Sequence, residues 1–283
     1  MAAAMRCYRH PDRETYISCS ECDRPICTEC MTPAPVGQRC PDHSGKPQGV
    51  ARVKSGVRRA GYEGTSGIVT RALIAVNVLV YLLELVNGGN VNGVGSKIYE
   101  KGVLFGPWVG QGDWWRLITS AFLHYGPLHL ALNMLGLWWF GTPVEQYLGR
   151  WRFLLVYFAS GLAGAAGALV IDPLAATAGA SGAIFGILGA ALVLERQRTY
   201  VLGGSAMAVI AINLVFSFSL SGHISIGGHV GGLIGGALCM LALSRFGRGH
   251  GAYGRLGVPG VAGVLAVGLL SVAIAYWKVR GYA

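Results

Sequence analysis

Long apolar runs follow one another through most of this chain, after a polar stretch of about 70 residues at its start. About 20 apolar residues in a helix cross the roughly 30 Å hydrocarbon core of a bilayer. Seven runs come close to that length, at positions 72–86, 127–148, 153–171, 181–194, 200–220, 227–243 and 256–277. The pattern predicts an all-α membrane protein with seven transmembrane helices, whose termini lie on opposite sides of the bilayer.

The composition supports this interpretation. Hydrophobic residues make up 53% of the 283 residues and charged residues only 13%, whereas a soluble domain is about 25% charged. The first apolar run begins too far along the chain to be a secretory signal peptide. We therefore expect a multi-pass integral membrane protein that carries a soluble segment in front.

The positions of lysine and arginine predict the orientation, because cytoplasmic loops carry an excess of both. With a cytoplasmic N-terminus, 18 of the 23 lysine and arginine residues lie inside. The five that lie outside are Lys97, Lys101, Arg116, Lys278 and Arg280. We therefore expect a cytoplasmic N-terminus and an outer C-terminus, in a bacterial cell membrane. The formal charge of +10 suits an anionic inner leaflet, so no nucleic-acid partner is expected.

Cysteine and histidine form four pairs in the polar front segment, each with two residues between its members. The pairs are Cys7 and His10, Cys19 and Cys22, Cys27 and Cys30, and Cys40 and His43. Each such turn presents two ligands to one ion, and Zn²⁺ takes four ligands in a closed structural site. Eight ligands predict two structural zinc ions in a module at 1–45. A disulfide framework is disfavoured, since this segment lies on the reducing cytoplasmic side.

The use of this zinc module is expected to be protein contact or regulation, with a cytoplasmic protein partner, because no ligand position is left open for a substrate. Which pairs share an ion stays open between sequential and interleaved pairing. The residues that follow, 46–67, are rich in glycine, serine and arginine without an apolar period. They predict a flexible basic linker.

The fourth apolar run is short, and its length locates Ser181. Residues 181–194 span about 21 Å as a helix, less than the hydrocarbon core. Charged residues at 195–198 hold its cytoplasmic end, so we expect Ser181 below the outer surface and within reach of it. The non-helical backbone at 172–178 then enters the membrane, which is tolerated only where it lines a cavity or is buried in protein.

The second, fourth and sixth runs share one direction, from outside to inside, so their starts lie at one depth. Polar residues that can do chemistry stand at these starts: His129 and Asn133, Ser181, and His229. A transporter is disfavoured, because these residues gather at one level instead of forming a relay across the membrane.

Glycines four positions apart mark the faces on which two of these runs can meet. They stand at 228, 232 and 236 in the sixth run and at 182 and 186 in the fourth. Faces of small residues let helices approach closely, which a hydrogen bond between Ser181 and His229 requires. A serine nucleophile and its histidine base are therefore predicted to meet inside the membrane.

A helix N-terminus supplies free N–H groups beside Ser181, and the helix dipole favours negative charge there. His129 and Asn133 lie one turn apart on one face and can donate to the same oxyanion. The competing chemistry is a metal site that uses His124 and His129 with Asn133. That site lacks a carboxylate partner at matching depth.

These residues resemble the rhomboid family of intramembrane serine proteases. The motifs that carry the resemblance are Gly179-Ala180-Ser181-Gly182, His229-Val230-Gly231-Gly232, the spacing of His124, His129 and Asn133, the pair Trp115-Arg116, and Glu145. The resemblance covers 68–245 and implies the six-helix rhomboid core, so that 246–283 form a cytoplasmic loop and a seventh helix. The front segment lies outside that pattern and resembles the B-box type of zinc finger, in which the ligand pairs interleave.

The resemblance implies a role for each site residue. Ser181 is the nucleophile, His229 the general base and acid, and His129 and Asn133 donate with the Ser181 N–H to the oxyanion, while Gly179 shapes the loop. Phe185 falls where the family places an aromatic residue against the catalytic histidine.

The implied function is serine endopeptidase cleavage of membrane-anchored proteins, within or next to a transmembrane segment. Substrate would enter laterally past the fifth run. The alternative is a non-catalytic rhomboid-like protein that binds membrane clients. The presence of both Ser181 and His229 argues against that alternative.

Overall fold

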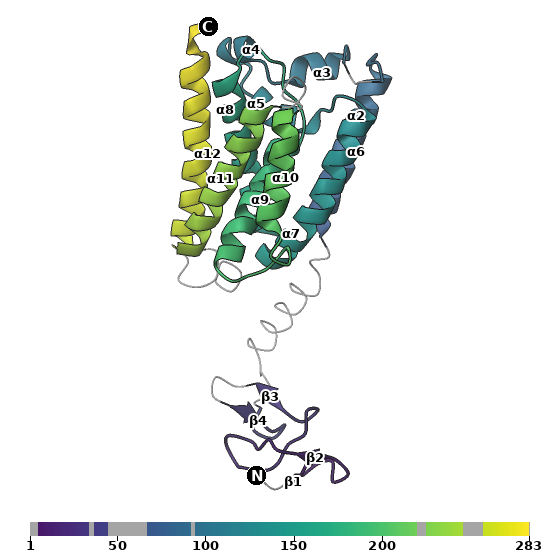
Figure 1. Ribbon diagram of the computed structural model, residues 1–283, viewed down its shortest axis with the longest axis vertical. Coiled ribbons are helices and arrows are strands. Elements are labelled where there is room, and N and C mark those ends of the chain that lie inside the picture. The colour runs from purple at the N-terminus through teal and green to yellow at the C-terminus, as the bar shows by residue number, and fades with distance from the viewer. Residues whose placement is uncertain are drawn as a thin grey trace. The chain divides into compact units, whose positions relative to one another are not determined.

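The computed structural model of this chain describes residues 5–33, 37–44, 67–91, 94–219, 225–245 and 257–282. The chain divides into two compact units, Met1–Gly61 and Tyr62–Ala283, and each is described by itself (Figure 1). Of the expected linker at 46–67, all but Gly67 lies outside the described residues.

Two small antiparallel strand pairs form the front unit. β1 (Met5–Arg6) pairs with β2 (Glu14–Thr15), and β3 (Thr32–Pro33) pairs with β4 (Gln38–Arg39). The buried centre consists of Ile26 and cysteine side chains. An apolar core of this size does not hold a domain together by itself, so it needs metal ions or cross-links.

Helices make up the second unit, with α3 and α4 together at one end of it and α7 at the other (Figure 1). Their bounds are α2 (Ile68–Val86), α3 (Lys97–Gly102), α4 (Gly106–Gly110), α5 (Arg116–Thr119), η1 (Ser120–Phe122), α6 (Pro127–Gly136), η2 (Leu137–Gly141), α7 (Thr142–Leu148), α8 (Arg150–Ile171), α9 (Ser181–Arg196), α10 (Ala206–Ser219), α11 (Ile226–Arg245), α12 (Val258–Val279) and η3 (Arg280–Tyr282).

Four helices within the described ranges are long and apolar enough to cross a membrane. They are Ile68–Val86, Arg150–Ile171, Ile226–Ser244 and Val258–Tyr282, and Ala206–Ser219 is a shorter apolar helix. Each apolar run of the sequence coincides with a helical segment, and the fourth run begins at Ser181 as expected. The second run is continuous through α6, the π-helical turn η2 and α7.

The fifth apolar run becomes helical six residues later than its apolar pattern begins, at Ala206. The carboxylate of Glu195 accepts hydrogen bonds from the backbone N–H groups of Leu202, Gly204 and Ala206. These bonds hold the residues after α9 in a turn, and Gly203 and Gly204 both have positive φ there. The apolar side chains at the start of this run therefore belong to a connection.

Glycine faces bring α11 into backbone contact with α9. A Cβ added at Gly232 would overlap the backbone of Gly182, and one added at Gly236 would overlap that of Gly186. These glycines belong to the two faces expected from the glycine spacing, and they hold the two helices at a separation that no larger side chain permits.

A second glycine face joins α11 to α8. A Cβ at Gly227 would overlap the carbonyl of Gly167, and one at Gly231 would overlap the carbonyl of Ala163. Adjacent glycines of α11 thus contact two different helices, so α11 is held between α8 and α9.

The segment before α9 is held by the loop that contains α3, α4 and α5. Leu104 and Thr177 form a backbone bridge, with N–H to O distances of 3.0 and 2.8 Å in the two directions. The Gly106 N–H donates to the carbonyl of Pro173 at 2.8 Å. This pairing satisfies the backbone polar groups of a non-helical segment and sets the position at which α9 begins.

Arg116 organises that loop from inside. Its guanidinium is buried and donates to the carbonyls of Glu100 and Val103 at 2.7 and 2.9 Å, and to the Asp113 carboxylate at 2.9 Å. It also lies over the Trp108 ring, 4.4 Å from its centroid. Arg116, one of the motif residues of the resemblance, thus fixes the first loop.

Glu145 joins the second apolar run to the first. Its buried carboxylate accepts from the N–H groups of Val69 and Thr70 at 3.0 and 2.7 Å, and from the Thr70 hydroxyl at 2.7 Å. These donors belong to the first turn of α2, where backbone N–H groups have no partner within the helix. Glu145 is therefore a cap for α2 and lies outside the candidate site.

Candidate active site and metal sites

Ser181 is the first residue of α9 and is half-buried. The loop before it turns sharply at Gly179, whose φ is +125°. The Gly179 N–H donates to the carbonyl of Ser120 at 2.9 Å, so the turn is fixed to the first loop. The N–H groups of the first turn of α9 are free to bind negative charge beside the Ser181 hydroxyl.

His229 lies in the first turn of α11, close to the start of α9. Its ring stacks on Phe185, with 4.0 Å between ring centroids and 15° between planes, which confirms the contact expected of Phe185. Phe185 stands one turn after Ser181 on α9. A Cβ at Gly182 would lie 3.4 Å from the carbonyl oxygen of Gly228, so the neighbours of Ser181 and His229 touch.

The hydroxyl of Ser181 and the ring of His229 do not form a hydrogen bond with each other in this structure. Catalytic hydrogen bonds without substrate are often long and shorten only in the reacting complex. What the fold supplies is the close approach of the two helix starts and a fixed plane for the imidazole.

Ser217 of α10 is a third residue at this site, and it was not among the sequence predictions. Its Oγ lies 2.7 Å from Nδ1 of His229 and donates to the carbonyl of Asn213 at 2.7 Å. It is 1% exposed. A single serine within an apolar run gives no signal in the sequence that it faces a histidine of another helix.

His129 and Asn133 of α6 lie beside Gly179. A Cβ at Gly179 would be 2.9 Å from Nε2 of His129 and 3.8 Å from Nδ2 of Asn133. Nδ1 of His129 accepts from the Tyr125 N–H at 3.2 Å. A backbone N–H can only donate, so the proton of a neutral His129 ring is on Nε2, the nitrogen that faces the loop before Ser181.

Asn133 uses part of its amide within its own helix. Its Nδ2 donates to the carbonyl of His129 at 2.9 Å, and an amide NH₂ group has a second N–H. The structure thus brings together Gly179, His129 and Asn133, as the sequence predicts, with two side-chain donors beside the turn.

His124 is buried, with its ring 5.2 Å from that of His129. In the described part of the chain, groups of three or more histidine, cysteine or acidic side chains that could hold a metal ion include neither of these histidines. The sequence has one more histidine shortly before His229, which is His223. His229 is preferred as the base because it lies on the small-residue face, and His223 lies outside the described residues.

The front unit gathers its eight cysteine and histidine ligands into two clusters that could bind metal ions. The clusters are Cys7, His10, Cys27 and Cys30, and Cys19, Cys22, Cys40 and His43. The pairs are interleaved: the first pair joins the third, and the second joins the fourth. Both histidines face their cysteines through Nδ1.

The distances within both clusters suit a tetrahedral ion. Nδ1 of His10 lies 3.3, 3.4 and 3.9 Å from the sulfurs of Cys27, Cys30 and Cys7. Zn–S and Zn–N bonds of about 2.3 and 2.0 Å place tetrahedral ligands roughly 3.5–3.8 Å apart. All seven cysteines of the chain lie among the described residues and are free in this structure.

The backbone of each cluster favours ionised cysteine. Burial raises the pKa of the Cys19 thiol, but the backbone amides of Cys40, Glu21 and Cys22 outweigh it and bring the pKa down to about 6. The Cys7 pKa is likewise lowered to about 6, against burial, by backbone amides. The Cys30 pKa is raised to about 11 by burial and then by the neighbouring thiols. Thiolate is the form that binds metal.

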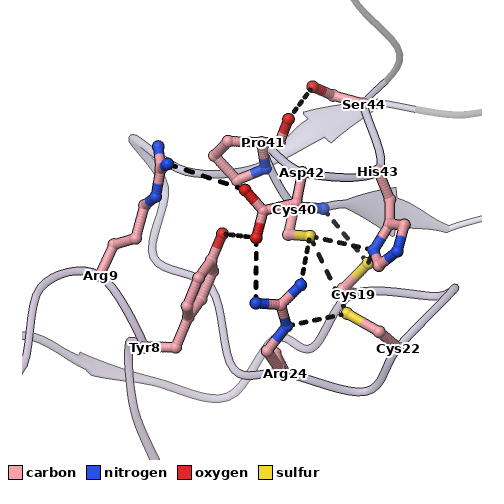
Figure 2. Close-up of polar contacts among 10 residues, drawn as sticks. All are labelled: Tyr8, Arg9, Cys19, Cys22, Arg24, Cys40, Pro41, Asp42, His43 and Ser44. Carbon is pink, nitrogen blue, oxygen red and sulfur yellow. Dashed lines mark hydrogen bonds and ion pairs between the residues drawn. The ribbon is translucent and has the colours of Figure 1, made fainter.

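Arg24 lies against the sulfurs of Cys22 and Cys40, two ligands of the second cluster (Figure 2). Its Nε donates to the sulfur of Cys22 at 3.3 Å, and Nη1 pairs with the Asp42 carboxylate at 2.9 Å. Tyr8 donates to the same carboxylate at 3.0 Å, and its ring lies under the guanidinium. Arg24 thus places a positive charge against the sulfur ligands and is held there by Asp42 and Tyr8.

Known proteins are similar to this chain in sequence. A family model described as the rhomboid domain matches residues 111–246. The rhomboid protease GluP of Bacillus subtilis (strain 168) is 41% identical over 206 residues, which are 71% of this chain and 39% of GluP. The chain thus spans less than half the length of that relative.

Two further relatives are covered over more of their length. YdcA of the same strain, which carries the same family name, is 40% identical over 134 residues, 46% of this chain and 67% of YdcA. The rhomboid protease AarA of Providencia stuartii is 29% identical over 208 residues, 62% of this chain and 72% of AarA.

Proposed function

The chain belongs to the rhomboid family, and from this premise we propose that it is an intramembrane serine endopeptidase. It cleaves membrane-anchored proteins within or next to a transmembrane segment. The observation that carries the proposal is the meeting of two helix starts: Ser181 opens α9, and His229 stacks on Phe185 one turn further along the same helix. Relatives named as rhomboid proteases support the same reaction.

Ser181 is the nucleophile and His229 is its base. Nε2 of His229 takes the hydroxyl proton as Oγ of Ser181 attacks the peptide carbonyl, and the same proton then passes to the leaving amine. The acyl-enzyme ester is hydrolysed by water, which His229 activates in the same way. This dyad needs no third carboxylate.

Three donors receive the oxyanion of the tetrahedral intermediate. They are the Ser181 N–H at the positive end of α9, Nε2–H of His129, and the second amide N–H of Asn133. The proposal is supported by the protonation of His129 that the Tyr125 N–H imposes, since a donor must point at the developing charge. Gly179 carries the turn that lets the backbone pass beside His129.

The protein is a multi-pass integral membrane protein. We propose a rhomboid core at 68–245 with six transmembrane helices, followed by a loop and the seventh helix at 246–283. A cytoplasmic N-terminus and an outer C-terminus are supported by the 18 of 23 basic residues that this topology places on one side. A bacterial membrane is supported by the bacterial relatives. Lateral entry past α10 is supported by the few side chains that α10 buries.

The front segment at 1–45 is proposed to be a B-box-like module with two structural zinc ions, followed by the basic linker at 46–67. Closed four-ligand sites hold a small fold together and leave no position for substrate. We propose contact with a cytoplasmic protein as its use, supported by the exposed Tyr16 side chain on its surface.

Cleavage of a reporter transmembrane segment by the purified full chain in detergent tests the proposed reaction. The segment should contain small, helix-breaking residues, because a helical peptide bond must unwind before attack. Ser181→Ala and His229→Ala should each lower kcat/KM by at least about a thousandfold. Ser271→Ala on α12, whose hydroxyl donates to the carbonyl of Val267, is the control and should leave the rate unchanged. Cleavage that survives Ser181→Ala would exclude the dyad, and binding without any cleavage would favour the client-binding alternative.

Metal analysis of the same preparation tests the front module. Two zinc ions per chain are expected, and one or none would contradict the eight-ligand assignment. Replacing Cys19 and Cys40 with serine should lower the number of zinc ions per chain. The helical content, measured by circular dichroism, should not change.

A further inference from the structure

The imidazole of His229 has a partner on its Nδ1 nitrogen that comes from a different helix. Oγ of Ser217, on α10, lies 2.7 Å from this atom. Both side chains are buried, at 1% and 7% exposure, so water does not compete for the contact. The dyad described above uses only Nε2 of His229, which leaves the bond on Nδ1 without an assigned purpose.

The direction of this hydrogen bond follows from a second contact. Ser217 Oγ also lies 2.7 Å from the carbonyl oxygen of Asn213. A carbonyl oxygen can only accept, so the single hydroxyl proton of Ser217 lies between these two oxygens. The Ser217 oxygen therefore accepts from His229, and the histidine proton is on Nδ1.

We infer that Ser217 is a positioning residue that keeps His229 in the tautomer of a general base. With the proton on Nδ1, Nε2 carries the free electron pair that receives the Ser181 proton. The inference rests on the proposed function of the dyad and adds a member to it. When His229 becomes an imidazolium, its Nδ1–H stays bonded to the Ser217 oxygen, and no proton moves to Ser217.

The chemical position of Ser217 is that of the carboxylate in a Ser-His-Asp triad, which orients the imidazole and sets its tautomer. A neutral hydroxyl does this without burying a charge in the membrane, where an unpaired carboxylate is costly. Stacking on Phe185 fixes the plane of the ring, and Ser217 fixes its rotation within that plane.

The two histidines of the site are thereby held in opposite tautomers by their surroundings. The Tyr125 N–H forces the proton of His129 to Nε2, which makes that nitrogen a donor. Ser217 forces the proton of His229 to Nδ1, which makes Nε2 an acceptor. Donor and base are thus distinguished by one hydrogen bond each.

The alternative is that Ser217 has no function beyond its hydrogen bond to the carbonyl four residues earlier, which buried serines in apolar helices commonly form. That contact would be present whether or not His229 lay opposite. The two interpretations differ in what they predict for the protonation of His229 and for kcat.

Kinetics of the full chain in detergent with the reporter segment is the first test. Ser217→Ala should lower kcat about tenfold, with KM within about twofold, because a neutral hydrogen bond that orients the base is lost and Ser217 touches no substrate. Ser217→Thr keeps a hydroxyl that can bond the same carbonyl and should restore most of the rate. Ser271→Ala on α12 is the matched control, because the Ser271 hydroxyl also donates to the carbonyl four residues earlier, that of Val267.

Nitrogen-15 NMR of the imidazoles is the second test and does not depend on cleavage. In the wild-type chain, the signals lost in His229→Ala should show an unprotonated Nε2 and a protonated Nδ1. In Ser217→Ala, Nε2 of His229 should become partly protonated. An unchanged tautomer together with an unchanged kcat in Ser217→Ala would overturn the inference.

The outcomes separate this inference from the proposed function. If the wild-type chain cleaves and Ser181→Ala does not, then a normal Ser217→Ala enzyme refutes only the positioning role. If the wild-type chain does not cleave at all, the proposed function fails, and the NMR result still decides the tautomer. A melting temperature equal to wild type in Ser217→Ala excludes a loss of fold as the cause.

Discussion

At the scale of single residues, Gly179 combines two constraints that no other residue type meets. Its φ of +125° lies in a region that side chains disfavour. A Cβ there would also approach Cε1 and Nε2 of His129 to 2.7 and 2.9 Å. The turn before Ser181 and the ring beside it are therefore shaped around the absence of a side chain.

Gly179→Ala should lower kcat/KM by roughly 5- to 150-fold, since backbone strain of about 1–3 kcal/mol acts directly on the loop before Ser181. Gly112→Ala is the matched control, because Gly112 has a φ of +113° with open space around it. Cleavage of the reporter segment measures both. Equal rates for the two variants would show that the approach to His129 has no effect.

Arg24 provides a second test at this scale, in the front unit. Arg24→Ala should weaken metal binding at the Cys19, Cys22, Cys40 and His43 cluster about 10- to 100-fold, because a positive charge that contacts the sulfur ligands is lost. Competition with a coloured chelator measures this. Arg39→Ala, which loses only an exposed ion pair with Glu21, should bind like wild type.

The sequence predicted the residues of the candidate site more completely than their protonation. Ser181, His129 and Asn133 were recognisable because chain direction places the starts of three apolar runs at one depth. The Tyr125 N–H and the Ser217 hydroxyl were not, because each acts through one hydrogen bond whose partner is known only after the helices pack. A lone serine in an apolar run has the same pattern whether it bonds its own helix or a neighbour.

At the scale of elements, the contact between α9 and α11 holds Ser181 and His229 together. Gly232→Ala should destabilise the helical unit by about 1–3 kcal/mol, because the new Cβ would overlap the backbone of Gly182. Cleavage should fall as well, since the two helix starts must separate. Thermal unfolding in detergent measures the first effect and kcat/KM the second.

The control for this prediction is Gly268→Ala on α12. A Cβ at Gly268 would lie 3.7 Å from a side-chain carbon of Leu162, an ordinary contact. Its melting temperature should stay close to that of wild type. A Gly232→Ala protein as stable as this control would mean that the two helices can separate without cost.

The start of a helix could be predicted from the sequence where the apolar run and the helical backbone begin at the same residue. The start of α9 at Ser181 is such a case. The start of α10 is not such a case, because Tyr200, Val201 and Leu202 are apolar but belong to a turn. The Glu195 carboxylate holds this turn by accepting hydrogen bonds from its backbone N–H groups. Hydropathy also does not report the π-helical turn within the second run, since a change of hydrogen-bond register leaves the side-chain composition the same.

At the scale of the whole molecule, the chain consists of two units that are stabilised by different interactions. The candidate active-site residues all belong to the helical unit, whereas the front unit has a core of one isoleucine and its cysteines. The first is held by packed helices and the second needs its ligands bound. The loss of metal should therefore affect the two units differently.

Chelation of the full chain should unfold the front unit and leave the helical unit active. Trypsin should then cut at Arg13 and Arg24, while labelling of Ser181 by a fluorophosphonate changes by less than about twofold. Re-addition of zinc should restore protection from trypsin. A parallel fall in Ser181 labelling would show that the front unit controls the active site.

The pairing of the proposed metal ligands could not be decided from spacing, because four identical gaps of two residues permit either order. The interleaved order has a consequence for assembly. An ion that joins Cys7 and His10 to Cys27 and Cys30 closes a loop that contains Cys19 and Cys22, and the second ion closes a loop that contains Cys27 and Cys30 in turn. Each ion would thus complete the framework of the other, so we expect loading to be cooperative. A titration followed by native mass spectrometry should show the metal-free and doubly loaded forms, with the singly loaded form scarce throughout.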